Sequence, residues 1–324
     1  MSKHFLVTGA LGCIGSWIVR NLVHQGVAVT AYDMAHDPHR LSLIMTPEQL
    51  AQVTFVRGDI TDLDAVLALM ETAGITDIIH LAALQVPACK ANPALGARVN
   101  VVGTVNIFEA AHRLGLSRVV YASSVATYGA REDYAGSLIR SGDPLNPRTL
   151  YGVYKQANEA TARVYAQDHG LSSIGLRPYV LYGPGRDQGM TSSPTKAMLA
   201  AALGVPYHIS YGGRSGMQYT DDVAKLFVRV AEVPFEGAQV YNIRGSVVDM
   251  SEVVDAIEQA APAARGTITF EPTPLPFPDG QEDTELQALL GSVHYTPLQE
   301  GVAATIEQFK TALSDGRLTA EAVG

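Results

Sequence analysis

Short apolar runs alternate, from the N-terminus to about residue 243, with longer segments whose apolar positions recur at helical spacing. The runs predict buried strands, and the segments between them predict helices. Such alternation predicts an α/β fold in which a doubly wound parallel sheet is covered by helices on both faces. The predicted strands cover residues 5–7, 27–33, 53–57, 77–83, 117–124, 173–177 and 239–243.

The helical segments begin and end at residues with known capping preferences. Gly26 ends the first helix, and a later helix begins after Asp62 and ends at Gly74, as capping acids and glycines commonly do. After Pro178 the alternation loosens, and the proline-rich stretch 272–278 is predicted to be a surface connection. The remaining predicted helices cover residues 92–113, 151–169, 194–203, 220–231, 249–260 and 297–313.

Three glycines, Gly9, Gly12 and Gly15, join the first strand to the first helix. Glycine lets the backbone turn tightly and approach an anion, and a helix N-terminus offers unpaired N–H groups and a partial positive charge. The second strand ends at Asp33, 18 residues after Gly15, near the spacing at which a carboxylate meets the ribose of a dinucleotide. The stretch therefore predicts dinucleotide binding, and NAD rather than NADP, because Asp33 would repel a 2′-phosphate.

A tyrosine and a lysine, Tyr151 and Lys155, lie one turn apart on the same face of a predicted helix. A tyrosine is a poor base at neutral pH, but a neighbouring ammonium stabilises its phenolate. The pair can then take a proton from a substrate hydroxyl while a hydride leaves the carbon. Ser124 ends the preceding strand, where its hydroxyl can hold the substrate oxygen. Alone, the spacing is more often surface decoration; after a dinucleotide unit it indicates an active site.

Composition narrows the class of protein. A chain of 324 residues with 47% hydrophobic and 17% charged residues is typical of a globular protein, and its length is sufficient for two domains. The formal net charge of −9 without a basic block argues against nucleic acid or an anionic membrane as partner. No signal peptide and no bilayer-length apolar run is evident. The two cysteines, Cys13 and Cys89, lie in no metal-ligand spacing, so we expect a reduced, cytoplasmic protein without a metal site.

Seven motifs together carry a family resemblance. They are Thr8-Gly-x-x-Gly-x-x-Gly15, Gly58-Asp59, His80-Leu-Ala-Ala83, Asn100-Val-Val-Gly-Thr104, Tyr121-Ala-Ser-Ser124, Tyr151-x-x-x-Lys155 and Arg177-Pro-Tyr-Val-Leu-Tyr-Gly-Pro184. In this order and over nearly the whole length, the chain resembles the extended short-chain dehydrogenase/reductases, the group that contains sugar-nucleotide epimerases and dehydratases. The resemblance implies a Rossmann domain with a smaller C-terminal substrate-binding lobe. The Rossmann domain would comprise residues 1–177 and about 218–248, and the lobe about 178–217 and 249–324.

The resemblance also implies roles for individual residues. Ser124 would be the hydrogen-bond partner, Tyr151 the acid and base, and Lys155 the phenolate stabiliser and ribose anchor. For Asn100, a role as a buried amide that satisfies backbone groups is as well supported as a role in cofactor binding. For Cys13, a small residue beside the pyrophosphate is favoured over a redox-sensing thiol. The cofactor-binding residues implied are Gly9, Gly12, Cys13, Ile14, Gly15, Asp33, Asp59, Ile60, Leu81, Ala82, Ala83, Asn100, Tyr151, Lys155 and Tyr179.

Departures from the family pattern concern the substrate. Sugar-nucleotide members carry an asparagine where this chain has Val180, and an arginine where it has Ser215; neither of these can bind a diphosphate as those residues do. Arg214 is one position away from the second site. The segments 80–88 and 185–193 are closer to members that oxidise small molecules, such as the short-chain type of L-threonine dehydrogenase. The predicted substrate contacts are Gln85, Ser124, Tyr151, Thr191, Ser192 and Arg214, with a plain polar loop as the alternative for 191–193.

Three functional hypotheses remain open from the sequence. The first is an NAD-dependent dehydrogenase that oxidises a secondary hydroxyl of a small polyhydroxylated substrate (a sugar, sugar acid or hydroxy acid). The second is an epimerase of the UDP-glucose 4-epimerase type that retains NAD. The third is a non-enzymatic NAD-binding protein, which would have little need of the pair Tyr151 and Lys155. The family commonly pairs the helices 92–113 and 151–169 across a twofold axis, so a homodimer is expected.

Overall fold

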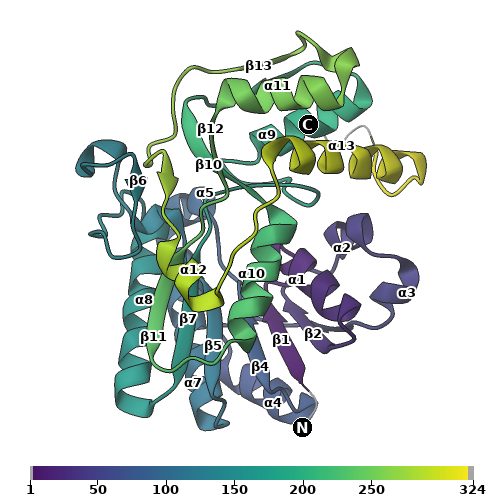
Figure 1. Ribbon diagram of the computed structural model, residues 1–324. Coiled ribbons are helices and arrows are strands. Elements are labelled where there is room, and N and C mark those ends of the chain that lie inside the picture. The colour runs from purple at the N-terminus through teal and green to yellow at the C-terminus, as the bar shows by residue number, and fades with distance from the viewer. Residues whose placement is uncertain (1–2, 320–324) are drawn as a thin grey trace.

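Seven parallel strands form the centre of the molecule, as the computed structural model, which describes residues 3–319, shows (Figure 1). Their order across the sheet is β3-β2-β1-β4-β5-β7-β11, so the chain winds in one direction from β1 and in the other from β4. The predicted doubly wound Rossmann sheet is therefore confirmed. The strands are β1 (His4–Thr8), β2 (Ala28–Asp33), β3 (Thr54–Arg57), β4 (Asp77–His80), β5 (Arg118–Ala122), β7 (Ser172–Arg177) and β11 (Ala238–Asn242).

Helices cover both faces of this sheet (Figure 1). On one face, α1 (Cys13–His24) and α10 (Thr220–Glu232) bury Trp17, Leu22 and Phe227 against the strands. On the other, Met70, Phe108 and Ala162 are buried from α4 (Leu63–Ala73), α7 (Gly103–Arg113) and α8 (Leu150–His169). Because both faces are covered, the middle residues of β1, β4 and β5 are consecutive apolar residues, which is the pattern that the sequence shows. Two short helices, α2 (His39–Ile44) and α3 (Pro47–Leu50), follow β2.

Helix α4 shows that local chemistry sets the helix ends. The Asp62 carboxylate accepts a hydrogen bond of 3.0 Å from the backbone N–H of Ala65, and Gly74 ends the helix in the left-handed conformation at φ +63°. Both features agree with the capping predicted from the sequence.

The predicted long helix 92–113 is helical but not uniformly α-helical. It consists of α6 (Pro93–Ala97), a π-helical segment (Arg98–Val102) and α7. The π-helical turn adds only one residue to the helix. The apolar positions therefore still recur at about 3.6 residues, and the sequence pattern does not reveal the turn. It contains Asn100, which is discussed below. A further short helix that the sequence analysis did not separate, α5 (Val86–Ala91), precedes this run.

The C-terminal part forms a smaller layer beyond the carboxyl ends of the strands (Figure 1). Its own core contains Met198, Ile257 and Phe309 from three helices, α9 (Ser193–Leu203), α11 (Met250–Ala260) and α13 (Leu298–Ser314). A three-stranded sheet lies beside them, in the order β12 (Ser246–Asp249), β10 (Arg214–Tyr219), β8 (Val180–Tyr182). The other elements are β6 (Leu138–Ile139), β9 (Tyr207–Ile209), β13 (Ile268–Phe270), β14 (Gly280–Gln281) and α12 (Thr284–Leu290).

The segment 272–278 connects β13 to β14, as predicted, and Pro272, Pro274 and Pro276 are exposed, but the segment does not lie wholly on the surface. Leu275 and Phe277 are each 7% exposed, and the Tyr179 hydroxyl donates a hydrogen bond of 2.9 Å to the carbonyl of Pro278. The apolar residues between the prolines pack into the core of the C-terminal layer, and this contact cannot be seen from the turn-forming residues alone. Among residues 3–319, no helix combines the length and the apolar character needed to cross a membrane.

Candidate active site

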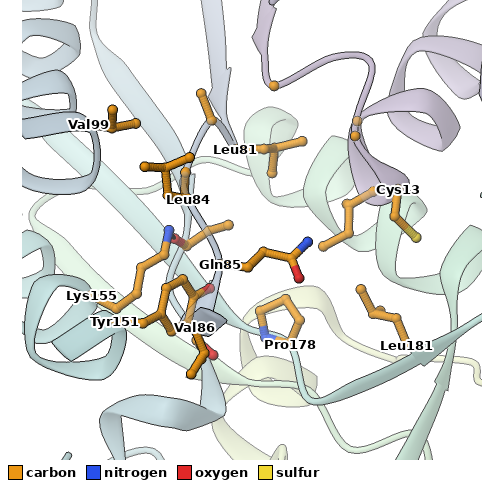
Figure 2. A pocket seen from close by; sticks show the side chains of 18 of the residues that line it. Cys13, Leu81, Leu84, Gln85, Val86, Val99, Tyr151, Lys155, Pro178 and Leu181 are labelled. Atoms are coloured by element: carbon orange, nitrogen blue, oxygen red, sulfur yellow. Dashed lines mark hydrogen bonds between the residues drawn. The ribbon is translucent and has the colours of Figure 1, made fainter. Parts of the chain in front are cut away.

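A cavity of about 410 Å³ lies along the carboxyl ends of β1, β2, β4 and β5 (Figure 2). The chain reverses its winding direction between β1 and β4, and ligands of doubly wound sheets bind at this point. Figure 2 shows Tyr151 and Lys155 on one side of the space, Cys13 on the other, and the side chain of Gln85 reaching between them. One end of the cavity is therefore the glycine turn, and the other contains the tyrosine–lysine pair.

The glycine turn has the shape that an anion requires. A Cβ atom on Gly9, where φ is +68°, would lie 2.7 Å from the nitrogen of Ala82, and one on Gly15 would lie 2.2 Å from the carbonyl oxygen of Gly9. Side chains are thus excluded on steric grounds, and the backbone is free to face the cavity. Helix α1 begins at Cys13, so its first N–H groups lack intrahelical partners and point towards the same space. These groups fit a pyrophosphate.

Asp33 closes the far end of this half of the cavity. Its Oδ2 accepts a hydrogen bond of 3.0 Å from the N–H of Leu11, and its Oδ1 accepts one of 3.0 Å from the N–H of Ala35. The carboxylate is therefore anchored by the glycine turn itself, with lone pairs left for ribose hydroxyls. Arg40 also lines the cavity, but its guanidinium is bonded to the Leu11 carbonyl and the Asp187 carboxylate. Asp33 remains the group that faces the predicted ribose position.

Most of the cofactor-binding residues predicted from the sequence line this one cavity. Asn100 does not, and its assignment to the cofactor is corrected here. It is fully buried, its Oδ1 accepts from the N–H of Leu84 at 2.7 Å, and its Nδ2 donates to the Leu84 carbonyl at 2.9 Å. It therefore orders the loop after β4 as a buried amide. The predicted residues that do line the cavity are Gly9, Gly12, Cys13, Ile14, Gly15, Asp33, Asp59, Ile60, Leu81, Ala82, Ala83, Tyr151, Lys155 and Tyr179.

His80, the last residue of β4, holds the start of the loop that follows this strand. It is 3% exposed, and its ring bridges the hydroxyl of Thr8 at 2.7 Å and that of Thr104 at 3.0 Å. Burial, with a smaller contribution from the charge of Lys155, lowers the pKa of His80 to about 3. The imidazole is therefore neutral at physiological pH and ties the end of β1 to the end of β4, where the cavity begins.

The predicted catalytic residues meet at the other end of the cavity. Ser124 and Tyr151 both line this end of the cavity, where the Ser124 side chain acts to lower the pKa of Tyr151, and the Lys155 ammonium lies 5.7 Å from the centre of the Tyr151 ring. Lys155 also donates a hydrogen bond of 2.7 Å to the carbonyl of Ala122, at the end of β5. Helix α8 and strand β5 thus bring the three side chains together, although Ser124 and Tyr151 lie far apart in the sequence.

Burial dominates the electrostatics of this group. It raises the pKa of Tyr151, although the hydrogen bond from Ser124 and the charge of Arg186 act in the opposite direction. It lowers the pKa of Lys155 to about 8, against the influence of Cys89 and Glu159. When the protein has no ligand bound, Tyr151 is a neutral phenol. Additional positive charge in the cavity would favour its phenolate.

A buried network behind these residues was not found by the sequence analysis. Ser123 donates to Glu159 at 2.5 Å, and the Arg177 guanidinium holds both Glu159 oxygens at 2.8 Å. Glu159 is 1% exposed and lies one helix turn after Lys155. The network joins β5, β7 and α8 directly beneath Ser124 and Lys155. Its sequence signal was an acid four residues after the lysine, but only the fold shows its partners.

The predicted substrate contacts divide into two groups. Gln85, Ser124, Tyr151 and Thr191 line the cavity. Ser192 and Arg214 do not, and both assignments are corrected. The Ser192 hydroxyl bonds the carbonyl of Gly189 at 2.9 Å, as in the plain polar loop considered as the alternative.

Arg214 lies exposed at the start of β10, where its guanidinium donates to the carbonyl of Val247 at 3.1 Å. The arginine that does line the cavity is Arg186, which the sequence analysis did not single out. Arg186 lines the cavity and donates a hydrogen bond of 2.8 Å to the Thr191 hydroxyl. Two further lining residues that were not predicted, Met190 and Phe277, are apolar.

Comparison with known proteins agrees with this geometry. Residues 5–243 match the model of the NAD dependent epimerase/dehydratase family. The chain belongs to this family. It is 32% identical over 315 residues to a UDP-glucose 4-epimerase of Mycolicibacterium smegmatis, and the match covers 94% of this chain and 98% of the relative.

Solved structures of two kinds of enzyme resemble the fold. A UDP-glucose 4-epimerase of Thermus thermophilus in complex with NAD has a TM-score of 0.81 and 27% identity, and covers 96% of this chain and 100% of its own. A partial-consensus L-threonine 3-dehydrogenase has a TM-score of 0.83 and 25% identity, and covers 95% of this chain and 100% of its own. The resemblance to extended short-chain dehydrogenase/reductases is confirmed, and NAD is the cofactor of the family.

Proposed function

We propose that the protein is an NAD-dependent dehydrogenase that oxidises a secondary hydroxyl of a small polyhydroxylated substrate (a sugar, sugar acid or hydroxy acid). The observation that carries the proposal is the meeting of Ser124, Tyr151 and Lys155 at one end of a cavity whose other end is the glycine turn. A hydroxyl bound by Ser124 and Tyr151 would then lie beside a dinucleotide that extends from the turn.

The residues of the chain account for the proton transfer. NAD, when bound, supplies the acceptor for the hydride that leaves the carbinol carbon. The Lys155 ammonium favours the Tyr151 phenolate, which takes the hydroxyl proton as the carbon–oxygen bond becomes a carbonyl. Ser124 holds the substrate oxygen throughout. Lys155 is fixed for this role because one of its three N–H groups is held by the Ala122 carbonyl. The net products are a ketone, a reduced cofactor and a proton.

A small substrate is supported by the positions at which sugar-nucleotide members bind a diphosphate. Val180 is 0% exposed in the core of the C-terminal layer, and Ser215 is 1% exposed within β10. Neither lines the cavity, and Arg214 faces away from it. The chain therefore offers no cationic or amide side chain at those positions. This favours a compact ligand over a nucleotide sugar.

An epimerase is the second candidate, because the relative with 32% identity is a UDP-glucose 4-epimerase. The catalytic residues would be the same, with the ketone reduced again by the retained cofactor. Incubation with NAD and a panel of sugars, sugar acids, hydroxy acids and UDP-sugars separates the two. We expect net NADH from a small substrate and none from the Tyr151→Phe variant. Interconversion of UDP-glucose and UDP-galactose without NADH release would instead establish the epimerase.

A further inference from the structure

Arg186 carries a positive charge into the cavity without a carboxylate beside it. Its only side-chain hydrogen bond within residues 3–319 goes to Thr191, and its Nε is buried without a partner. The neighbouring acid, Asp187, cannot serve, because its carboxylate is held by Arg40 at 2.8 Å and by His39 at 3.1 Å. An uncompensated guanidinium with a buried nitrogen is costly to the folded protein. The cost is recovered when an anion binds there.

The position of Arg186 is that of a substrate contact. Its charge reaches Tyr151, whose pKa it lowers against the larger effect of burial. Gly189 shows how close Gln85 lies: a Cβ on this glycine would be 2.1 Å from Gln85 Oε1 and 3.3 Å from Arg186 Nη2. Gln85, Arg186 and Thr191 thus surround one end of the cavity, on the loops that follow β4 and β8.

We propose that Arg186 binds a carboxylate of the substrate, so that the substrate is a hydroxy acid or sugar acid. This inference rests on the proposed dehydrogenase and deepens it. Thr191 accepts from Nη2 and so fixes the guanidinium plane, and the outer N–H groups that make no bond within residues 3–319 are left to donate to a carboxylate in the cavity. A substrate held in this way would present its carbinol to Ser124 and Tyr151.

The rest of this end of the cavity suits a singly charged group. Gln85 and Thr191 are neutral, and Val86, Met190 and Phe277 are apolar. One guanidinium among such residues balances a carboxylate, whereas a diphosphate with two or more negative charges would remain largely uncompensated. The other anion in reach is the cofactor pyrophosphate, since the charge of Arg186 also acts on Cys13 in the glycine turn. The experiment distinguishes this case.

The test uses the full-length protein saturated with NAD and three pairs of probes that differ in one carboxylate: glycerate and glycerol, threonate and threitol, galacturonate and galactose. Wild type, Arg186→Gln and Arg265→Gln are compared; Arg265 is an exposed arginine outside the cavity and serves as the matched control. Calorimetric titration gives the dissociation constant of each probe and of NAD. NADH formation is recorded in parallel.

We expect at least one acid to bind wild type about tenfold more tightly than its neutral partner, in line with the strength of a hydrogen bond to a charged group. Arg186→Gln should remove this preference and leave the NAD dissociation constant within about twofold, while Arg265→Gln behaves as wild type. The inference fails if no acid is preferred. It also fails if Arg186→Gln weakens NAD and retains the preference, because Arg186 would then serve the pyrophosphate.

The two proposals can fail separately. Binding of an acid through Arg186 without NADH formation would keep the carboxylate site and remove the dehydrogenase. Oxidation of a neutral polyol at an unchanged rate in Arg186→Gln would keep the dehydrogenase and remove the carboxylate site.

Discussion

The guanidinium of Arg40 and the carboxylate of Asp187 form a two-pronged ion pair, with Nη2–Oδ1 at 2.8 Å and Nε–Oδ2 at 3.1 Å. Arg40 lies on α2, next to the glycine turn, and also bonds the Leu11 carbonyl at 2.8 Å. Asp187 lies in the loop that carries Arg186 and Thr191 over the cavity. The pair therefore joins the turn that receives the cofactor to the loop that covers the substrate.

Breaking this pair should loosen the cofactor. In Asp187→Asn the loop loses its charged anchor, and we expect NADH to dissociate roughly threefold to tenfold faster, as for a partly exposed ion pair worth about 1 kcal/mol. Stopped-flow measurement of NADH fluorescence gives the rate. Glu271→Gln, which removes an exposed pair with His208 away from the cavity, is the control. An unchanged rate in Asp187→Asn would show that the pair does not restrain the cofactor.

Replacing the catalytic phenol should stop turnover without preventing cofactor binding. Tyr151→Phe removes the group that accepts the proton, so kcat should fall by about 100-fold or more. NAD affinity should stay within a few-fold, because the glycine turn and Asp33 are untouched. Tyr154→Phe is the control: that hydroxyl lies on the same helix, and its one bond within the described residues goes to the Pro93 carbonyl. Near-normal turnover in Tyr151→Phe would remove this residue from the mechanism.

Asp33 should set the preference for NAD. The carboxylate can accept hydrogen bonds from the ribose and would repel a 2′-phosphate. Asp33→Ser should raise KM for NAD and improve NADP relative to it, as the ratio of kcat/KM values would show. Arg40 is engaged by Asp187 and Leu11 in the wild type. A wild-type protein that already prefers NADP would mean that the assignment of Asp33 is wrong.

His80 should make the fold sensitive to acid. Its pKa is about 3 in the folded state and near 6.5 when unfolded, so between these values only the unfolded chain binds the proton. Stability therefore falls as the pH drops from 6.5 towards 3, and this residue alone should cost about 2 kcal/mol between pH 7 and pH 5.

Urea unfolding at pH 7 and pH 5 measures this loss. His80→Gln retains a donor and an acceptor for the two threonines but cannot titrate, so its stability should fall less over the same interval. His294→Gln replaces an exposed histidine and should behave as the wild type. An equal loss in His80→Gln and the wild type would exclude His80 as the titrating group.

We propose that two adjacent helices form a homodimer interface. Leu95 and Val102 are 46% and 48% exposed on the run that includes α6 and α7, and Val153 and Val164 are 44% and 50% exposed on α8. Val153 and Val164, eleven residues apart, lie on one face of α8, and α6 and α7 lie against this helix. A stable twofold contact should bury at least about 1,000 Å² there. Light scattering at micromolar concentration should give a dimer, and Val102→Lys together with Val153→Lys a monomer; a wild-type monomer would contradict the proposal.

Three features of the site were determined by the sequence itself. The turn requires glycine for local reasons, because Gly9 has a φ of +68° and a Cβ on Gly15 would lie 2.2 Å from the Gly9 carbonyl oxygen. Tyr151 and Lys155 lie on one helix face because a helix places residues four apart on the same side. Asp33 ends the strand that the parallel sheet places beside β1. In each case a repeating backbone geometry links the spacing to the position, so the fold class and most of the cofactor residues follow from local order.

The substrate end was decided by tertiary structure alone. Arg214 and Arg186 both lie in the region where the alternation of strands and helices loosens. The sequence pattern there gives no reason to choose one of them over the other as the substrate contact. Pairing of β10 with β12 leaves Arg214 exposed beside Val247, while Arg40 holds the carboxylate of Asp187 and Arg186 lines the cavity. Asn100 likewise has a structural role, because its side-chain amide is hydrogen-bonded to both the N–H and the carbonyl of Leu84. These outcomes depend on contacts between segments that are distant in the chain. The local periodicity of the sequence does not show which side chain such contacts place in the cavity.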